Sequence, residues 1–258
     1  MYCIMTVMKG AFIDEVFSSI QGEGVWAGQR QIFVRFIGCD LVCRYCDTPG
    51  SAGAAVSADE QRSCRAQAKT ASPAYEQVVN PLGPAVLTKL CSRLLISGPS
   101  RPVISLTGGE PLLQSGFLEE WLPSLRSTFT IYLETSGIHV REMRSTARLV
   151  DVVSMDLKLP SATGMRPFWD EHRAFLNAVG DAEVFAKSVI TASTSAEDIL
   201  IAARIIADRE ESMPFILQPA SGAHAPSAAQ MLQWQADALS LLADVRVIPQ
   251  THRMLGVP

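Results

Sequence analysis

The chain has 258 residues, of which 48% are apolar and 19% charged, and its formal net charge is −4. This composition is typical of a globular protein; it argues against a disordered chain and against the basic surface that nucleic-acid binding needs. No apolar run is long enough to cross a bilayer, and the basic residue Lys9 follows the apolar N-terminal stretch, the reverse of a signal peptide. We therefore expect a cytoplasmic protein that acts on small molecules or other proteins, without a membrane or nucleic-acid partner.

Short apolar runs alternate with amphipathic stretches along most of the chain. The runs predict β-strands at residues 32–37, 103–106, 130–133, 150–155, 184–190, 215–217 and 245–248. The amphipathic stretches predict helices at residues 85–96, 116–125, 171–178, 196–209 and 227–242. Such alternation indicates parallel strands with helices outside, and no G-x-G-x-x-G segment follows the first run to favour a doubly wound, dinucleotide-binding sheet. We predict an α/β fold, a partial (β/α) barrel of about six units in a single domain over residues 1–258.

Residues 49–84 interrupt this alternation. They are rich in Ala, Ser, Gly and Pro and show no clear period. We predict an insertion that is partly helical over residues 59–67 and is either a lid or a mobile loop; the sequence does not decide between the two.

Three cysteines, Cys39, Cys43 and Cys46, stand within eight residues directly after the first predicted strand. An odd number of thiols so close together suits one metal centre better than disulfides. A cubane iron–sulfur cluster held by three thiolates keeps one iron open to a small molecule. Zinc is the alternative, but it needs a fourth ligand, and no other cysteine or histidine is convincingly placed. The scattered cysteines Cys3, Cys64 and Cys91 are expected to be buried or idle thiols.

Polar residues follow most of the predicted strands directly. In parallel barrels the active site lies at the carboxyl ends of the strands, so these residues are expected to share one rim. They are Thr107, Glu110, Glu134, Thr135, Ser136, Ser154, Asp156, Lys158, Gln218 and Gln250.

Several of these residues allow two interpretations. Gly108 and Gly109 let the backbone approach a ligand, although Gly-Gly is also common in turns. Glu110 could pair with an amine. Glu134 to Ser136 suit ribose hydroxyls or a helix N-cap, and Asp156 and Lys158 suit a strand-end ion pair or a ligand site.

Residues outside the strand ends are also ambiguous. Tyr45 could stack on a base or only pack its loop. Residues 19–24 form a predicted loop that could recognise an amide-bearing heterocycle or be an ordinary connection. Arg35, inside an apolar strand, must meet a carboxylate of the protein or of a substrate. Thr48 could contact a hard cation or cap a helix.

The cysteine spacing, with Tyr45 before the last cysteine, resembles the radical S-adenosylmethionine superfamily, and Gly-Gly-Glu-Pro at residues 108–111 resembles its methionine-amine site. A closer resemblance runs along the whole chain. It is to the 7-carboxy-7-deazaguanine synthase family, lyases of 7-deazapurine (queuosine) biosynthesis, and rests on residues 19–24, 35–48, 107–114, 133–137, 156–160 and 249–252.

The resemblance implies a fold of the radical S-adenosylmethionine type and a role for each motif. Cys39, Cys43 and Cys46 would hold a [4Fe-4S] cluster, and Thr48 would contact Mg²⁺. The residues implied for S-adenosylmethionine are Tyr45, Gly109, Glu134, Thr135, Ser136, Ser154 and Lys158. Those implied for the substrate, 6-carboxy-5,6,7,8-tetrahydropterin, are Ile20, Gln21, Gly22, Arg35, Thr107 and the C-terminal Pro258. The family also implies a homodimer and a reductant protein such as flavodoxin.

Two rival functions differ in class. One is a radical enzyme that activates a partner protein and needs a protein-docking surface; residue Gln21, the Arg35 cation and Pro258 favour a small-molecule substrate instead. The other is a non-enzymatic iron–sulfur or zinc regulator, which would not need the polar strand ends.

Overall fold

The computed structural model describes residues 10–46, 48, 53 and 62–258. In this part of the chain ten strands form one sheet, in the order β10-β9-β8-β7-β6-β5-β2-β1-β3-β4. Neighbours from β2 to β10 follow chain order and are all parallel. These parallel strands are β2 (Arg30–Phe36), β5 (Val103–Gly108), β6 (Thr130–Thr135), β7 (Val152–Asp156), β8 (Glu183–Ile190), β9 (Phe215–Pro219) and β10 (Val245–Val247).

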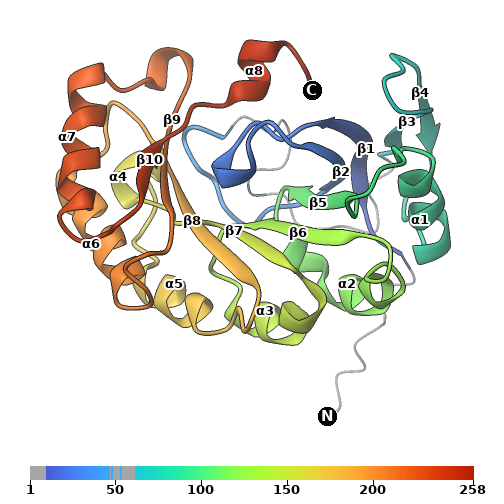
Figure 1. Ribbon diagram of the computed structural model, residues 1–258, viewed down its shortest axis with the longest axis horizontal. Helices are drawn as coiled ribbons and strands as arrows, with labels where there is room; N and C mark the ends of the chain where they lie inside the picture. The colour runs from blue at the N-terminus through green and yellow to red at the C-terminus, as the bar shows by residue number, and fades with distance from the viewer. Residues whose placement is uncertain (1–9, 47, 49–52, 54–61) are drawn as a thin grey trace.

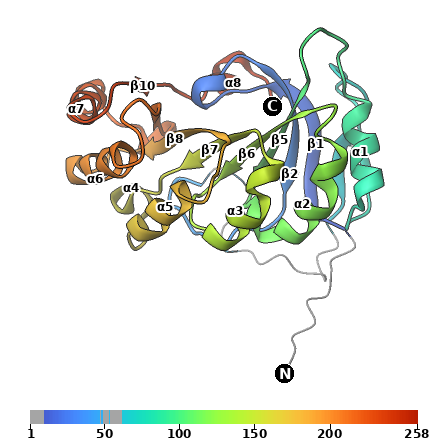
Figure 2. The ribbon, with the colours of Figure 1, turned by 60° about the horizontal axis from the view of Figure 1, so that its bottom comes forward.

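Helices connect the parallel strands and lie along the outer side of the curved sheet (Figures 1 and 2). They are α1 (Pro84–Ser92), α2 (Ser115–Trp121), α3 (Val140–Thr146), α4 (Pro160–Thr163), α5 (Trp169–Leu176), α6 (Ala196–Ala207) and α7 (Ala228–Leu239), with α8 (Thr251–Leu255) near the C-terminus. The predicted α/β partial barrel is confirmed. None of the helices in the described residues is long and apolar enough to span a membrane.

The N-terminal edge of the sheet differs from the prediction. Strand β1 (Ile13–Ile20) pairs antiparallel with β2, so Ser19 and Ile20 belong to a strand and only residues after them form a turn. The sequence hides β1 because its buried residues include the polar Ser18 and Ser19.

The predicted helix over residues 59–67 is wrong where it can be compared. Cys64–Gln67 is strand β3, parallel to β1, and Tyr75–Val78 is strand β4, antiparallel to β3. Burial of Cys64 and Ala66 on either side of the exposed Arg65 shows the two-residue period of a strand. Residues 49–52 and 54–61 of the segment predicted to be a lid or a mobile loop lie outside the described residues.

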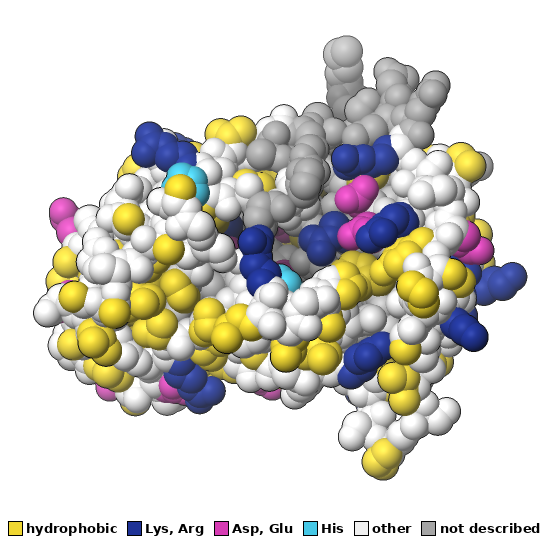
Figure 3. Space-filling model, turned by 90° about the horizontal axis from the view of Figure 1, so that it is seen from above, with side chains coloured by type: hydrophobic (Ala, Val, Ile, Leu, Met, Phe, Trp, Pro, Cys, Tyr) yellow, Lys and Arg dark blue, Asp and Glu magenta, His cyan; other side chains and the backbone are white. Residues whose placement is uncertain are grey.

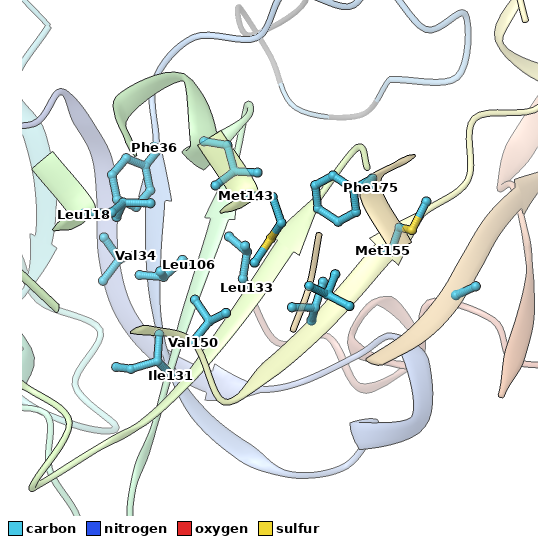
Figure 4. Close-up of a cluster of buried hydrophobic side chains, with 14 of the residues drawn as sticks. Val34, Phe36, Leu106, Leu118, Ile131, Leu133, Met143, Val150, Met155 and Phe175 are labelled. Carbon is cyan, nitrogen blue, oxygen red and sulfur yellow. The ribbon is translucent and has the colours of Figure 1, made fainter. Parts of the chain in front are cut away.

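The two faces of the parallel strands pack differently. On the outer face, Leu106, Leu133 and Met155 meet the helix residues Leu118, Met143 and Phe175 in the main hydrophobic core (Figure 4). Each fully buried side chain of this kind contributes about 1.5–3 kcal/mol to folding. This core fixes the positions of the parallel strands.

The inner face changes from apolar to polar along the strands. Its floor consists of Val103, Tyr132, Val152, Phe185 and Ile216, and is covered by Val25, Trp26 and Ile248. Because side chains alternate along a strand, the residue two positions further on faces the same way. The residues that follow on this face are Ser105, Glu134, Ser154, Lys187 and Gln218. The carboxyl ends of the strands therefore bring polar groups together above a dry floor.

Candidate active site

A cavity of about 250 Å³ opens at the carboxyl ends of the parallel strands. Figure 3 shows a hollow in this face of the molecule, with basic and histidine side chains at its edge. The cavity wall contains Cys39, Cys43 and Cys46 together with every residue implied for S-adenosylmethionine: Tyr45, Gly109, Glu134, Thr135, Ser136, Ser154 and Lys158. The structure thus brings these predicted residues to one place.

A second cavity, of about 280 Å³, adjoins the first. Its wall contains all the residues implied for the substrate: Ile20, Gln21, Gly22, Arg35, Thr107 and Pro258. Arg35, Thr48, Thr107 and Glu134 line both cavities. The two spaces are therefore adjacent compartments of one site; we name them the cofactor compartment and the substrate compartment.

The three clustered cysteines lie on a loop that follows β2. Burial raises the pKa of Cys39 to about 11 and also raises the pKa of Cys43, so both are neutral thiols unless a cation stabilises the thiolates. In the described part of the chain no three His, Cys, Asp or Glu side chains already converge as a metal site. The three thiols line one wall of the cavity, as a three-cysteine cluster site requires.

Gly109 and Glu110 connect the ends of neighbouring strands. A Cβ on Gly109 would lie 1.9 Å from the Gly38 carbonyl oxygen, so only glycine allows these backbones to approach. The buried Glu110 carboxylate accepts hydrogen bonds from Leu112 N at 3.1 Å, Thr135 Oγ1 at 2.9 Å and Ser136 Oγ at 2.7 Å. Glu110 therefore braces the loop after β6, and a ligand amine would have to share it with these donors.

Glu134, Thr135 and Ser136 do not cap a helix, because the N-cap of α3 is His139. Glu134 instead accepts hydrogen bonds from Gln21 Nε2 and Thr107 Oγ1, both at 2.9 Å. One carboxylate thus joins the two compartments.

The ion pair predicted at the end of β7 is present. Lys158 Nζ donates to Asp156 Oδ2 at 2.8 Å and lies 5.7 Å from the centre of the Tyr45 ring. Burial alone would lower the pKa of Lys158, but the charge of Asp156 raises it well above its ordinary value. In the described structure Asp156 Oδ1 and Gln218 Oε1, both on cavity-lining residues, have no hydrogen-bond partner. Unpaired buried acceptors are expected where a ligand supplies donors.

Comparisons with known proteins agree with this geometry. No family model matches the chain. The 7-carboxy-7-deazaguanine synthase of Geobacter sulfurreducens is 39% identical over 256 residues, covering 96% of this chain and 98% of that protein. The synthase of Methanopyrus kandleri is 35% identical, covering 95% and 94%. The chain belongs to the 7-carboxy-7-deazaguanine synthase family.

Solved structures support the fold. QueE from Escherichia coli aligns with a TM-score of 0.57 at 20% identity and covers 94% of this chain and 95% of that chain. Streptococcus suis SuiB, solved with S-adenosylmethionine, aligns with a TM-score of 0.50 at 14% identity, over 83% of this chain and 48% of that chain.

In this member of the synthase family, Arg35 meets a carboxylate of the protein. Its Nε lies 3.3 Å from Glu15 Oε2, while Arg65 of β3 lies 2.6 Å from the other oxygen of Glu15. The sequence left open whether the partner of Arg35 was protein or substrate; in the described structure it is Glu15.

A buried ion pair between Lys187 and Glu23 was missed by the sequence reasoning. Lys187, on β8, donates to Glu23, which also accepts from Gln250 Nε2 at 2.8 Å. Burial raises the pKa of Glu23, but the charge and hydrogen bond of Lys187 outweigh it and bring the pKa down to about 2. The available signal was a lone lysine in an apolar strand, the same signal that pointed to Arg35.

The C-terminal segment reaches the substrate compartment by packing on the turn after β1. Thr251 N donates to Gly22 O at 2.9 Å. A Cβ on Gly22 would lie 1.9 Å from Nδ1 of His252. Gly22 therefore lets α8 lie against the turn, which brings Pro258 to the cavity wall.

Proposed function

We propose that the chain converts 6-carboxy-5,6,7,8-tetrahydropterin to 7-carboxy-7-deazaguanine with loss of ammonia, as a radical S-adenosylmethionine lyase of 7-deazapurine biosynthesis. The observation that carries the proposal is the pair of adjoining compartments, one lined by all the residues implied for cofactors and the other by all those implied for the pterin. Full-length similarity to proteins named as synthases supports the same reaction.

Cys39, Cys43 and Cys46 would hold a [4Fe-4S] cluster that leaves one iron open to the cofactor. The cluster and S-adenosylmethionine, when bound, would supply the radical chemistry that removes a hydrogen atom from C6 of the pterin. The protein positions the reactants and excludes water. Glu134 to Ser136, Ser154 and Lys158 would orient S-adenosylmethionine, with Tyr45 and Gly109 on the same wall.

The substrate compartment would bind the pterin through complementary charge and hydrogen bonds. Arg35 would pair with the pterin carboxylate, because a guanidinium matches a carboxylate bidentately. The backbone of Ile20 to Gly22 would face the amide-bearing ring, with Thr107 and Pro258 beside it. Thr48, which lines both compartments, would contact a Mg²⁺ ion shared with the substrate carboxylate. A flavodoxin-like reductant, a homodimer and a cytoplasmic location complete the proposal.

The relatives weaken the two rival functions. Neither a radical enzyme that activates a partner protein nor a non-enzymatic regulator would need the substrate compartment. The full-length relatives described above are named as 7-carboxy-7-deazaguanine synthases.

An anaerobic assay tests the proposal. Cluster-reconstituted protein receives dithionite, S-adenosylmethionine, Mg²⁺ and 6-carboxytetrahydropterin, and mass spectrometry follows the products. We expect 7-carboxy-7-deazaguanine without stoichiometric loss of S-adenosylmethionine. If only 5′-deoxyadenosine accumulates, the proposed substrate is wrong. If protein with a full cluster does not cleave S-adenosylmethionine, the proposed reaction class is wrong.

A further inference from the structure

A buried histidine outside both compartments connects two loops of the cofactor compartment. His172, on α5, has no solvent-exposed surface. Its Nδ1 lies 3.0 Å from the Gly137 carbonyl oxygen, and the Lys158 backbone N–H donates to its Nε2 at 3.1 Å. A carbonyl can only accept and an amide N–H can only donate, so the ring must be neutral with its proton on Nδ1. Burial, which lowers the pKa of His172 to about 4, favours the same neutral form.

The two bonds end next to cavity residues. Gly137 directly follows Ser136, and Lys158 carries the ammonium that pairs with Asp156. Gly137 has φ +68°, and a Cβ there would lie 2.7 Å from Met155 and 3.3 Å from Nδ1 of His172. The loop after β6 therefore packs closely against the His172 ring, and the same ring accepts a hydrogen bond from the loop after β7.

We propose that His172 is a positioning residue for S-adenosylmethionine: by fastening the backbones of Gly137 and Lys158 to α5, it fixes the Ser136 and Lys158 side chains in the cofactor compartment. This inference rests on the proposed function of that compartment. His172 does not line either cavity, so its effect passes through the two loops. The imidazole ring suits this bridge because one of its nitrogens donates a hydrogen bond and the other accepts one. An apolar side chain of the same size would leave the buried Gly137 carbonyl and the buried Lys158 N–H unpaired.

Three substitutions separate the two bonds. In His172→Asn the side-chain amide lies nearest the position of Nδ1, so it can still donate to Gly137. In His172→Gln the amide oxygen reaches the position of Nε2, so it can still accept from Lys158. His172→Phe fills the volume beside Phe168 and Trp169 but makes neither bond. Phe175→Leu is the matched control, because Phe175 is a fully buried residue of the same helix that belongs to the apolar core.

All measurements of the test use full-length protein. Equilibrium binding of S-adenosylmethionine to the cluster-loaded protein should show a Kd raised roughly ten- to hundredfold in His172→Phe and by less in the Asn and Gln variants, the scale expected for unmade buried hydrogen bonds. The KM for the pterin should change less than about threefold, and Phe175→Leu should lose stability with little change in Kd. Hydrogen exchange of the Lys158 amide, without cofactor, should accelerate in the Phe and Asn variants and stay near the parent rate in the Gln variant.

The outcomes separate the inference from the function on which it rests. If the parent enzyme is active and the Phe variant binds S-adenosylmethionine within twofold of it, His172 has only a structural role and the inference is wrong. If the Phe variant does not fold, the Asn and Gln variants decide: unchanged Kd in both overturns the inference, and a raised Kd in either supports it. A parent protein that neither binds nor cleaves S-adenosylmethionine would instead overturn the proposed function, and the inference with it.

Discussion

The two compartments are built in different ways. The cofactor compartment is formed by the ends of β5, β6 and β7, whose positions are set by parallel pairing and by the outer core. The substrate compartment combines the turn after β1 with a C-terminal segment that is 229 positions away along the chain. The first is built on the strand ends, and the second adds to strand residues a contact between two segments that are far apart along the chain.

This difference predicts different responses to substitution. Changes beneath the cofactor compartment should reduce both stability and activity, because the same residues hold the sheet and the site. Changes at the contact between the turn and the C-terminal segment should alter pterin binding while the fold keeps its stability. Four substitutions test this contrast, from the largest expected effect to the smallest.

Cys43→Ser should abolish activity, with a loss of at least about a thousandfold, because a serine hydroxyl is a poor replacement for a cluster thiolate. Iron content and the visible absorption of the reconstituted protein provide the measurement. Cys91→Ala is the matched control: Cys91 is a fully buried residue of α1, outside both cavities, and its truncation should cost about 1 kcal/mol with the cluster intact. A Cys43→Ser protein with full iron content would contradict the assignment of the ligands.

Lys187→Met tests the link between the compartments. It leaves the Glu23 carboxylate buried without its cation, which should reduce the free energy of unfolding by about 3–5 kcal/mol. Chemical denaturation measures this loss, and Lys187→Met combined with Glu23→Gln should recover part of it because no charge is then left unpaired.

The same pair gives a pH signature. The pKa of Glu23 falls from its ordinary value of 4.5 to about 2 in the folded protein, so its contribution is present above pH 4.5 and lost as the pH falls toward 2. Lys187→Met should flatten this acid-side slope. A parent-like slope in the variant would show that other carboxylates carry it.

The residues of the two compartments also show what could be predicted from the sequence. Strand-end residues such as Glu134 and Lys158 were predicted because apolar periodicity locates the parallel strands, and parallel strands put their carboxyl ends on one rim. The partners of Lys187, Arg35 and Gly22 could not be predicted, because Glu23, Glu15 and His252 reach them through tertiary packing that periodicity does not encode. Strands β1 and β3 were missed for a related reason: the buried polar residues Ser18 and Ser19 in β1 and Gln67 in β3 break the apolar alternation.

Gly22→Ala should weaken the substrate compartment alone. The new Cβ would overlap the His252 ring, so α8 must move and carry Pro258 with it. We expect the KM for the pterin to rise roughly ten- to hundredfold, the range found when positioning is lost by about an ångström, with little change in the Kd for S-adenosylmethionine. Gly116→Ala, in α2 with nothing within 4 Å of the added Cβ, is the control and should leave both constants unchanged. A parallel loss of S-adenosylmethionine affinity in Gly22→Ala would show that the compartments are not independent.

Glu15→Gln should have the smallest effect, and it should lower the KM for the pterin where Gly22→Ala raises it. Glu15 and a substrate carboxylate would compete for the same Arg35 guanidinium, and both Arg35 and Glu15 are partly exposed, at 26% and 20% of the side chain. A partly solvated pair of this kind contributes about 0.2–1 kcal/mol, so removing its charge should lower the KM for the pterin by a factor of about 1.5–5. The gain should shrink as salt concentration rises, because screening already weakens the pair. A higher KM would mean that Glu15 orients Arg35 for the substrate instead of competing with it, and Arg65, which shares Glu15, would then belong to the substrate compartment through that carboxylate.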